Sequence, residues 1–510
     1  MIFALGLAFL SGYIALSYEI LWFRAYSFAS GSAAQAFGLL LGAYLVGIAI
    51  GSLVSGWACR GAEDSFPEVS WGALSGLIFF ANVLGYLFVP AMAWLLTIDG
   101  TSWVETVPLV GIVSAGLGAI FPLISHFSVA PDETAGANVS YIYLANILGS
   151  ASGSLITGFW LMDRWPLRGI SLCLGLLGLA MTAIVLLRRG SRFWLRLAAV
   201  AGVGALMAIL NPQLFAGLYE KLQLKSAYWP GYRFAHVVET KSGVITVDQA
   251  GIVYGGGMYD GAFNTSLDRD VNGIVRAYAL AGLHPRPRQV LMIGLSSGSW
   301  ATVIANHPAV EELTIVEINP GYARLIPEYA EVAELLNNPK VRIEFDDGRR
   351  WLVRNQDRRF DAIVSNTSFH WRVHTSNLLS VEFLELVRSR LRNGGIFYYN
   401  TTDSPRVQKT GVAVFPYALG IQNFLALSDR PLGFDRRLWK ERLENYPRQG
   451  RRLFDPARGE DRERLERLAE GIAAGVEARE SIVARSRDLI PVTDDNMGTE
   501  WSEPIFPIFH

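Results

Sequence analysis

The chain has 510 residues, of which 51% are hydrophobic and only 18% charged, and its formal net charge is −1. Such a composition lies between that of a soluble enzyme and that of a membrane transporter. The near-neutral charge argues against a nucleic-acid partner, because neutralising a phosphate backbone requires a basic surface. The two cysteines, Cys59 and Cys173, lie in or beside apolar segments, so we expect neither a disulfide framework nor a metal site.

Charge is distributed unevenly along the chain. Residues 1–225 hold 10 of the 45 Lys and Arg and 10 of the 46 Asp and Glu, which leaves 35 and 36 for the rest. We therefore predict a lipid-embedded part followed by a water-soluble part. The predicted domains are a transmembrane helical domain at 1–220, a small β unit at 226–265 and a ligand-binding α/β domain at 266–510.

Seven apolar stretches are each long enough for the roughly 20 residues that cross a hydrocarbon core. They are residues 2–24, 33–58, 71–97, 104–129, 136–162, 168–188 and 193–216. The first lacks a basic leading region and a small-residue cleavage site, so we interpret it as a retained helix. Gly47 and Gly51 in one stretch, and Gly149 and Gly153 in another, put small residues on one helical face, which predicts close helix packing.

The hydrophobic period changes to two at about residue 233, and residues 235–254 predict a small antiparallel β unit. An alternation of strands and helices follows. Strands are predicted at 289–294, 313–318, 341–345, 360–365 and 395–400, with helices such as 321–336 and 379–391 between them. This order predicts an open, mostly parallel, Rossmann-like sheet of the class I methyltransferase type. The charged run 461–487 predicts an amphipathic surface helix.

A glycine-containing loop closes the strand that ends at Ile293, and Glu317 ends the next strand about 20 residues later. This spacing is typical of a nucleotide-binding βαβ unit, in which the acid accepts hydrogen bonds from ribose hydroxyls. Gly294, Ser296 and Gly298 are predicted to form the floor of the site. We expect a ligand that contains adenosine.

Other strand ends meet at the same edge of the sheet. Asp346, Asp347 and Gly348 follow one strand, and Asp347 is placed to accept from an adenine amino group. Asn366 follows another strand and is a further candidate for binding adenosine. The loop lacks a P-loop lysine and its glycines are four apart, which disfavours triphosphate hydrolysis and dinucleotide binding.

Several segments resemble spermidine synthases, the aminopropyltransferases. They are residues 259–261, 283–294, 316–319, 346–349, 360–364 and 394–396. The apolar part (18–22, 118–122 and 143–149) and the segments 493–496 and 500–501 resemble bacterial membrane proteins with a fused spermidine synthase-like domain. The resemblance implies that S-adenosylmethionine or its decarboxylated form binds, without a metal. It also implies that Asp260 and Asn264 hold the amino and carboxylate ends of a methionine-like tail.

Departures from the family pattern fall on the half of the site that handles an amine. Ser297 stands where the family has an acid, and Asn366 and Phe369 replace two more acids. Burying a protonated polyamine without those carboxylates is costly, so ordinary polyamine synthesis is disfavoured.

The loop that carries these replacements is rich in rings. Trp371 and Tyr259 are candidates to face a sulfonium, and His370 or His374 to act as a general base. The alternative is that the loop residues pack a lid or contact the membrane domain.

We predict a membrane-bound enzyme that uses S-adenosylmethionine, cleaves it at the γ-carbon and releases 5′-methylthioadenosine. The candidate catalytic residues are Tyr259, Asp260, Asn366 and His370. The acceptor is an uncharged or membrane-delivered molecule, or the substrate's own amino or carboxylate group, as in a lyase or cyclase. A methyltransferase and a non-catalytic sensor coupled to the helical bundle are the remaining alternatives.

Adenosyl compounds are made in the cytosol. We therefore expect a multi-pass protein of the bacterial inner membrane with a cytoplasmic catalytic domain. Its expected partners are a small-molecule substrate and the lipid bilayer, without nucleic acid, and a homo-oligomer is left open.

Overall fold

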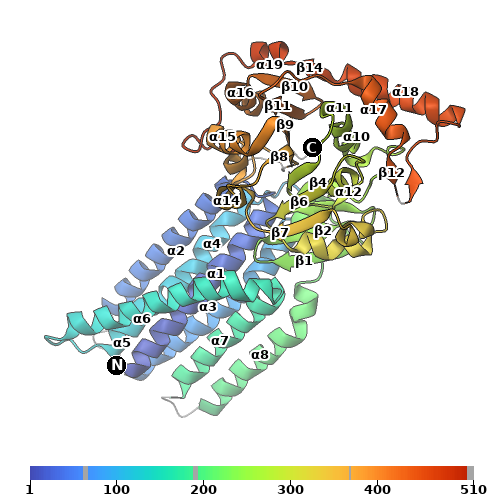
Figure 1. Ribbon diagram of the computed structural model, residues 1–510. Helices are drawn as coiled ribbons and strands as arrows, with labels where there is room; N and C mark the ends of the chain where they lie inside the picture. The colour runs from blue at the N-terminus through green and yellow to red at the C-terminus, as the bar shows by residue number, and fades with distance from the viewer. Residues whose placement is uncertain (61–66, 188–192, 367–368, 449, 502–510) are drawn as a thin grey trace. The chain divides into compact units, whose positions relative to one another are not determined.

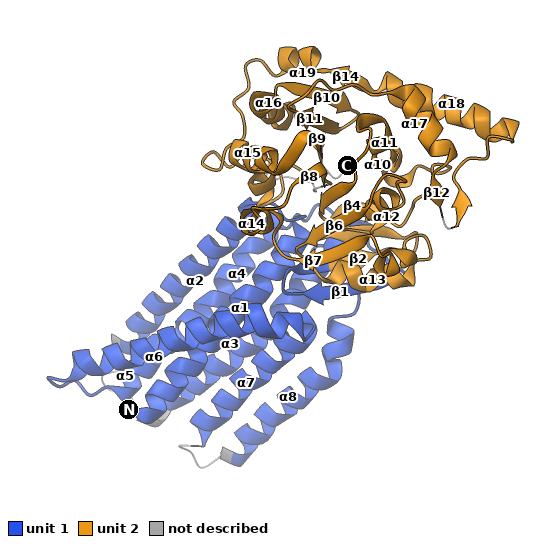
Figure 2. Cartoon of the chain, viewed as in Figure 1, with its two compact units in different colours: residues 1–244 blue, residues 245–510 orange. Residues whose placement is uncertain are grey.

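The structure is a computed structural model that describes residues 1–60, 67–187, 193–366, 369–448 and 450–501 (Figure 1). The chain forms two compact units, unit 1 at Met1–Val244 and unit 2 at Ile245–His510 (Figure 2). Unit 1 is mainly helical, and unit 2 is built on a mixed sheet. The predicted fold class, a multi-span helical bundle followed by a class I methyltransferase-like α/β domain, is confirmed.

Seven helical segments in the described part of unit 1 are long and apolar enough to cross a membrane. They are Ile2–Ala29, Gln35–Cys59, Trp71–Leu95, Val104–Ser128, Ala135–Asp163, Leu167–Leu186 and Trp194–Leu214. The corresponding elements are α1 (Ile2–Ala29), α2 (Gln35–Arg60), α3 (Pro67–Leu95), α4 (Val107–Gly118), α5 (Ile120–Ser128), α6 (Ala135–Leu155), α7 (Leu167–Leu186) and α8 (Phe193–Leu214). The short helix α9 (Leu218–Leu224) and the strand β1 (His236–Thr240) follow.

The small residues predicted to pack helices do so in two helix pairs. A Cβ added at Gly47 or Gly51 of α2 would collide with the backbone of α4 at Gly111 or Ala115. Gly149 of α6 meets the backbone of α1 at Phe9 in the same way. Such contact of backbones lets dispersion forces act where lipid removes the hydrophobic drive for association.

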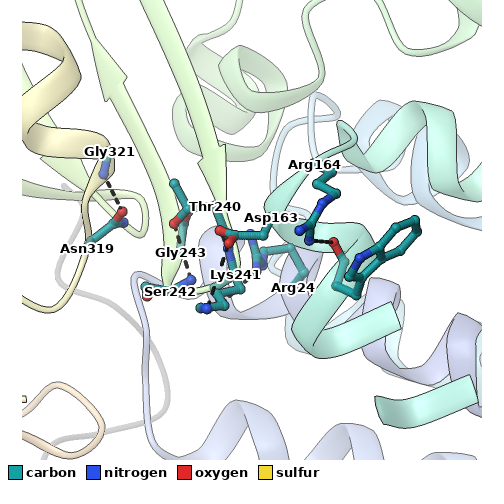
Figure 3. A network of polar contacts seen from close by, with 10 residues as sticks. Arg24, Asp163, Arg164, Thr240, Lys241, Ser242, Gly243, Asn319 and Gly321 are labelled. Atoms are coloured by element: carbon teal, nitrogen blue, oxygen red, sulfur yellow. Dashed lines mark hydrogen bonds and ion pairs between the residues drawn. The ribbon is translucent and has the colours of Figure 1, made fainter. Parts of the chain in front are cut away.

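A polar network in unit 1 surrounds Arg24, near the end of α1 (Figure 3). Its guanidinium donates to the carbonyl oxygens of Thr240 and Lys241, at 2.7 and 3.1 Å. The ammonium of Lys241 lies 3.7 Å from the carboxylate of Asp163. The half-buried carboxylate of Glu239 accepts from the backbone N–H of Leu167 at 2.8 Å. These bonds fix β1 to the helices of unit 1.

Unit 2 begins with antiparallel strands. β2 (Gly243–Val247), β3 (Ile252–Gly255) and β4 (Met258–Ala262) pair in chain order, with a bulge in β3 between Val253 and Tyr254. This is the predicted antiparallel β unit.

The main sheet of unit 2 has eight strands in the order β14-β10-β11-β9-β8-β5-β6-β7. β5 (Gln289–Ile293), β6 (Glu312–Glu317), β7 (Val341–Phe345), β8 (Phe360–Ser365) and β9 (Leu391–Asn400) are parallel. β10 (Tyr417–Ile421), β11 (Phe424–Ser428) and β14 (Val476–Ala478) add an antiparallel edge. The carboxyl ends of the parallel strands therefore share one edge, where their loops meet.

Helices cover this sheet, and two short strands form a separate two-stranded sheet. They are α10 (Val275–Tyr278), α11 (Leu280–Leu283), α12 (Ser299–Ala305), α13 (Gly321–Leu325), α14 (Gly348–Arg354), α15 (Val381–Arg390), α16 (Pro405–Val414), α17 (Arg436–Glu444), α18 (Gly459–Ala474) and α19 (Arg479–Arg485), with β12 (Pro447–Arg448) and β13 (Arg451–Arg452). The core between helices and strands is apolar, and Leu291, Phe383 and Phe397 are fully buried in it. Strands buried on both faces are typical of parallel sheets, which explains their continuous apolar runs.

Two predicted helices are wrong in extent. The helix predicted over 461–487 divides at Gly475 into α18 and α19, because the intervening β14 pairs with β10. The helix predicted over 321–336 ends at Leu325, and short 3₁₀ segments at Ile326–Glu328 and Ala333–Asn337 replace the rest. Pro327 lies in the first of them, and a proline ring disfavours continuation of the preceding α-helix.

The glycine contacts in unit 1 predict different effects on stability for two alanine substitutions in α2. Gly51→Ala should destabilise the protein by about 1–3 kcal/mol, since the new methyl group collides with the Ala115 carbonyl. Gly56→Ala is the control, because a Cβ there meets nothing within 4 Å, and it should be neutral or stabilise by up to about 1 kcal/mol through helix propensity. Thermal unfolding midpoints in detergent measure both. Equal shifts in the two variants would contradict the described packing of α2 on α4.

Candidate active site

The loop between β5 and α12 turns through left-handed backbone conformations. Gly294, Ser296 and Gly298 have φ angles of 91°, 48° and 74°. A Cβ at Gly298 would collide with Ile326, and a Cβ at Gly294 would lie 3.6 Å from the carbonyl oxygen of Asn366. Glycine is therefore required at 298, and at 294 it leaves the backbone open for close approach by a ligand.

Glu317 ends β6 and is only 4% exposed. Its carboxylate accepts from the backbone N–H of Leu295 at 2.6 Å and from that of Asn319 at 2.7 Å. Burial raises the pKa of Glu317 to about 7, although these backbone hydrogen bonds oppose the shift. One carboxylate thus joins the glycine loop to the turn after β6, and a carboxylate has room for about four hydrogen bonds in all.

Asp260 of β4 lies beside the same loop. Its backbone carbonyl accepts from the hydroxyl of Ser296 at 2.6 Å, and its carboxylate accepts from the hydroxyl of Tyr322. Burial raises the pKa of Asp260, and the positive charge of Arg372 opposes that rise. The charge of Asp260 in turn raises the pKa of Glu317 further. The two carboxylates therefore belong to one electrostatic site.

Arg372 lies beside Asp260, and Arg276 lies beside Tyr259. Arg372 donates from Nη2 to the carbonyl oxygen of Gly255 at 3.0 Å. Arg276 donates to the carbonyl oxygens of Asn272 and Gly273 at 2.6 and 2.9 Å and to the side chain of Asn423. The ring of Phe424 lies 5.1 Å from the Arg276 guanidinium, which suits a cation–π contact.

Tyr259 lies between Asp260 and Arg276. Its hydroxyl donates to Oδ1 of Asn272 at 2.9 Å, and its side chain is 37% exposed. Burial and the charge of Asp260 raise the pKa of Tyr259, while Arg276 lowers it. Asn272 also borders the glycine loop, since a Cβ at Gly261 would lie 3.0 Å from Ser296 Oγ and 3.4 Å from Asn272 Nδ2.

The turn after β7 is built by its own hydrogen bonds. Asp347 caps α14, since its carboxylate accepts from the backbone N–H of Arg350 at 2.8 Å. Asp346 forms ion pairs with Arg350 and Arg354, and these offset its desolvation and lower its pKa. A Cβ at Gly348 would lie 2.6 Å from Ile293, so glycine lets this turn pack against the end of β5.

The remaining predicted site residues differ in their surroundings. The side chain of Asn264 bonds within its own loop, donating to the carbonyl oxygens of Ser266 and Val271 at 3.1 and 3.2 Å. Trp371 stacks on Phe369 with ring centroids 5.6 Å apart. Nδ1 of His370 lies 2.8 Å from the hydroxyl of Thr499.

The loop after β8 is held by a distant segment. The buried carboxylate of Glu500 accepts from the backbone N–H groups of His374 and Ser376, at 2.9 and 2.7 Å. Asn366 is half-buried at the start of this loop. Thr367 and Ser368, which lie between Asn366 and Phe369, are outside the described residues.

Sequence reasoning assigned no role to Tyr322 or Arg372. Tyr322 follows Asp260 by 62 residues, so only the fold brings its hydroxyl to that carboxylate. Arg372 lies in the ring-rich loop after Asn366. A basic residue in a loop that has lost two acids of the family pattern could have indicated a role in binding an anionic group.

Residues 279–414 match the family model described as "Spermine/spermidine synthase domain". The polyamine aminopropyltransferase of Moorella thermoacetica is 31% identical over 151 residues, which cover 28% of this chain and 52% of that enzyme. The polyamine aminopropyltransferase of Mycobacterium tuberculosis is 24% identical over 437 residues, 80% of this chain and 81% of that enzyme. This second match therefore extends well beyond the 136 residues of the family model (414 − 279 + 1).

Two solved structures that align with this chain are also spermidine synthases. The crystal structure of spermidine synthase from Thermotoga maritima aligns over 50% of this chain and 88% of that chain, with 15% identity and a TM-score of 0.38. A spermidine synthase in complex with the transition state analogue AdoDATO aligns with 15% identity and a TM-score of 0.37, over 50% and 87% of the two chains. Residues 279–414, in the C-terminal part of the chain, match this family model, and that match confirms the predicted resemblance to spermidine synthases.

The titration of Glu317 predicts how stability changes with pH. Because burial raises its pKa from 4.5 to about 7, the folded protein binds more protons than the unfolded chain between these values. The resulting stabilisation, up to about 3 kcal/mol, is full below about pH 4.5 and is lost as the pH rises through 7. Thermal unfolding midpoints of the full chain between pH 5 and 8 measure this slope. The Glu317→Gln side chain does not titrate, so this variant should show a smaller change of the unfolding midpoint with pH. An unchanged slope would show that another group is responsible for the pH dependence.

Proposed function

We propose that this protein is a membrane-anchored enzyme whose unit 2 binds S-adenosylmethionine or its decarboxylated form and releases 5′-methylthioadenosine. The observation that carries the proposal is the carboxylate of Glu317, hydrogen-bonded to the loop that follows β5 within a spermidine synthase domain. The seven apolar helical segments of unit 1 support an anchor in the bacterial inner membrane, with unit 2 in the cytoplasm where adenosyl compounds are made.

The residues present suit an adenosyl ligand. Gly294 leaves its backbone open beside Asn366, and the Glu317 carboxylate can accept from ribose through the acceptor sites that its backbone donors do not use. An ionised Glu317 is the better acceptor, and hydroxyls that donate to it would lower its pKa again. Asp346, Asp347 and Gly348 form the turn nearest the adenine in this arrangement.

Asp260 is suited to bind the ammonium group of the methionine-derived tail. Its carboxylate is oriented by Tyr322 and by the bond between its backbone carbonyl and Ser296. Removal of one partner of a buried charge pair is costly, so an ammonium that compensates Asp260 would stabilise the bound state. In the bound ligand, the bond between sulfur and the γ-carbon breaks with its electron pair left on sulfur, which departs as the neutral thioether.

The acceptor side of the site does not suit a polyamine. Asn366 and Phe369 stand at the positions of two carboxylates in the family pattern, and the Arg276 guanidinium lies beside Asn272, to which Tyr259 donates. A second positive charge about 5 Å from a guanidinium loses about 3 kcal/mol at an effective dielectric constant of 20. This repulsion favours attack on the γ-carbon by the substrate's own carboxylate, which gives a lactone, or by its own amino group after the ammonium has given a proton to a base, which gives a ring. An uncharged acceptor that loses its proton to a base is the remaining possibility.

The product formed from S-adenosylmethionine alone tests the proposal. We expect purified full-length protein in detergent or nanodiscs to form 5′-methylthioadenosine without an added amine, identified by chromatography and mass spectrometry. Formation of 5′-methylthioadenosine only when a polyamine is added together with the decarboxylated form would support γ-carbon cleavage but restore ordinary aminopropyl transfer. S-adenosylhomocysteine as product would show a methyltransferase, and binding without turnover would favour a sensor; either result would overturn the proposal.

The two ends of β6 provide a matched pair of variants. Glu317→Ala should weaken binding of 5′-methylthioadenosine about tenfold to a hundredfold, as expected for loss of charged hydrogen bonds to ribose. Glu312→Ala removes the same side chain from the start of the strand, where it pairs with Arg358 at 2.6 Å, and should leave binding unchanged. Calorimetric titration measures the affinity of both variants. Equal affinities would show that Glu317 does not bind the ligand.

A further inference from the structure

We infer that the site selects intact S-adenosylmethionine over its decarboxylated form, with Arg372 binding the α-carboxylate and Asp260 the α-ammonium. The inference rests on the proposed function, because it concerns the tail of the same ligand. It makes Arg372 a residue that determines substrate specificity. Arg372 had no assigned role in the sequence analysis.

The geometry of Gly255 brings Arg372 and Asp260 together. Nη2 of Arg372 donates to the Gly255 carbonyl at 3.0 Å. A Cβ added at Gly255 would lie 3.1 Å from Oδ2 of Asp260 and would collide with the hydroxyl of Tyr322. The guanidinium and the carboxylate therefore both border one glycine of β3. Their charges interact, since Arg372 lowers the pKa values of both Asp260 and Tyr322 against the effect of burial.

An adjacent cation and anion match an α-amino acid. Such a group carries its ammonium and its carboxylate on one carbon, so a site that binds both needs a positive and a negative side chain next to each other. The decarboxylated tail has only the ammonium. It would gain the attraction of Asp260 but also the repulsion of Arg372, and nothing in the ligand would replace the lost bidentate contact to the guanidinium.

Arg372 is held in place by the backbone of its own loop. Glu500 accepts from the N–H groups of His374 and Ser376, and the hydroxyl of Thr499 donates to the carbonyl oxygen of His370 at 2.9 Å. These bonds flank Arg372 on both sides and hold the loop backbone in one conformation. A guanidinium placed in this way loses less entropy when it binds a carboxylate than one on a flexible loop.

Asn264 is the less suitable partner for the carboxylate. Its amide nitrogen donates to Ser266 and Val271, and its amide oxygen accepts from the N–H of Ser266 at 3.0 Å. Binding a ligand through this amide would require breaking bonds that shape the loop after β4. An amide also carries no positive charge. It would therefore discriminate only weakly between S-adenosylmethionine, which has the α-carboxylate, and the decarboxylated form, which has a hydrogen atom in its place.

The test compares three ligands by calorimetric titration of the full chain in detergent. S-adenosylmethionine carries both charged groups of the tail, its decarboxylated form carries one, and 5′-methylthioadenosine carries neither. We expect the wild-type protein to bind S-adenosylmethionine at least tenfold more tightly than the decarboxylated form. Arg372→Gln should remove this preference by weakening S-adenosylmethionine about tenfold to a hundredfold, while 5′-methylthioadenosine binds as before.

Arg288→Gln is the matched control, since it removes the same charge at the start of β5, where Arg288 pairs with Glu311 at 3.2 Å. It should leave all three affinities unchanged. Tighter or equal binding of the decarboxylated form by the wild type would overturn the inference. So would an equal loss for all three ligands in Arg372→Gln, which indicates a structural role.

Failure of the proposed function gives a different result. If 5′-methylthioadenosine does not bind to the wild type, the adenosine site itself is wrong and the inference falls with it. If all ligands bind with the expected ratios but no turnover occurs, the tail preference stands and only the proposed reaction is overturned.

Discussion

The carboxylate of Glu317 makes the bonds on which the carboxyl edge of the main sheet in unit 2 depends. It accepts from Leu295 in the loop after β5 and from Asn319 in the turn after β6, so it joins the ends of two neighbouring parallel strands. A buried acid costs free energy when it ionises, and a pKa near 7 reflects that cost. Near neutral pH this carboxylate can therefore be neutral, which favours folding, or ionised. The ionised form would be the better acceptor for the ribose hydroxyls of the proposed ligand.

The acids of the site act as a coupled set. Asp260 raises the pKa of Glu317, Tyr322 donates to Asp260, and Arg372 supplies the opposing charge. Replacing any one of these groups changes the protonation of the others, so the effects of single variants are not expected to add. In the proposed complex, the ammonium and the carboxylate of the ligand tail would add two further charges to this set.

Much of unit 2 was predictable because its signals are local. Continuous apolar runs fixed the central strands to within a few residues, and Glu317 followed from its spacing after Gly294. Partners distant in sequence were not predictable. β14 became a strand only because β10, more than 50 residues earlier, offers it a free edge, and Tyr322 meets Asp260 only through the fold. The residue roles and the domain bounds at 220 and 266 stay predictions.

The bond between Glu500 and His374 spans 126 residues of sequence, and it has a consequence for biosynthesis. A ribosome adds about 5–20 residues per second, so the segment that holds the Arg372 loop emerges about 6–25 s after that loop. Local helices form within about a microsecond, and the apolar helices of unit 1 are made earlier still. The loop after β8 therefore acquires its final shape late, when the apolar segments have already left the ribosome.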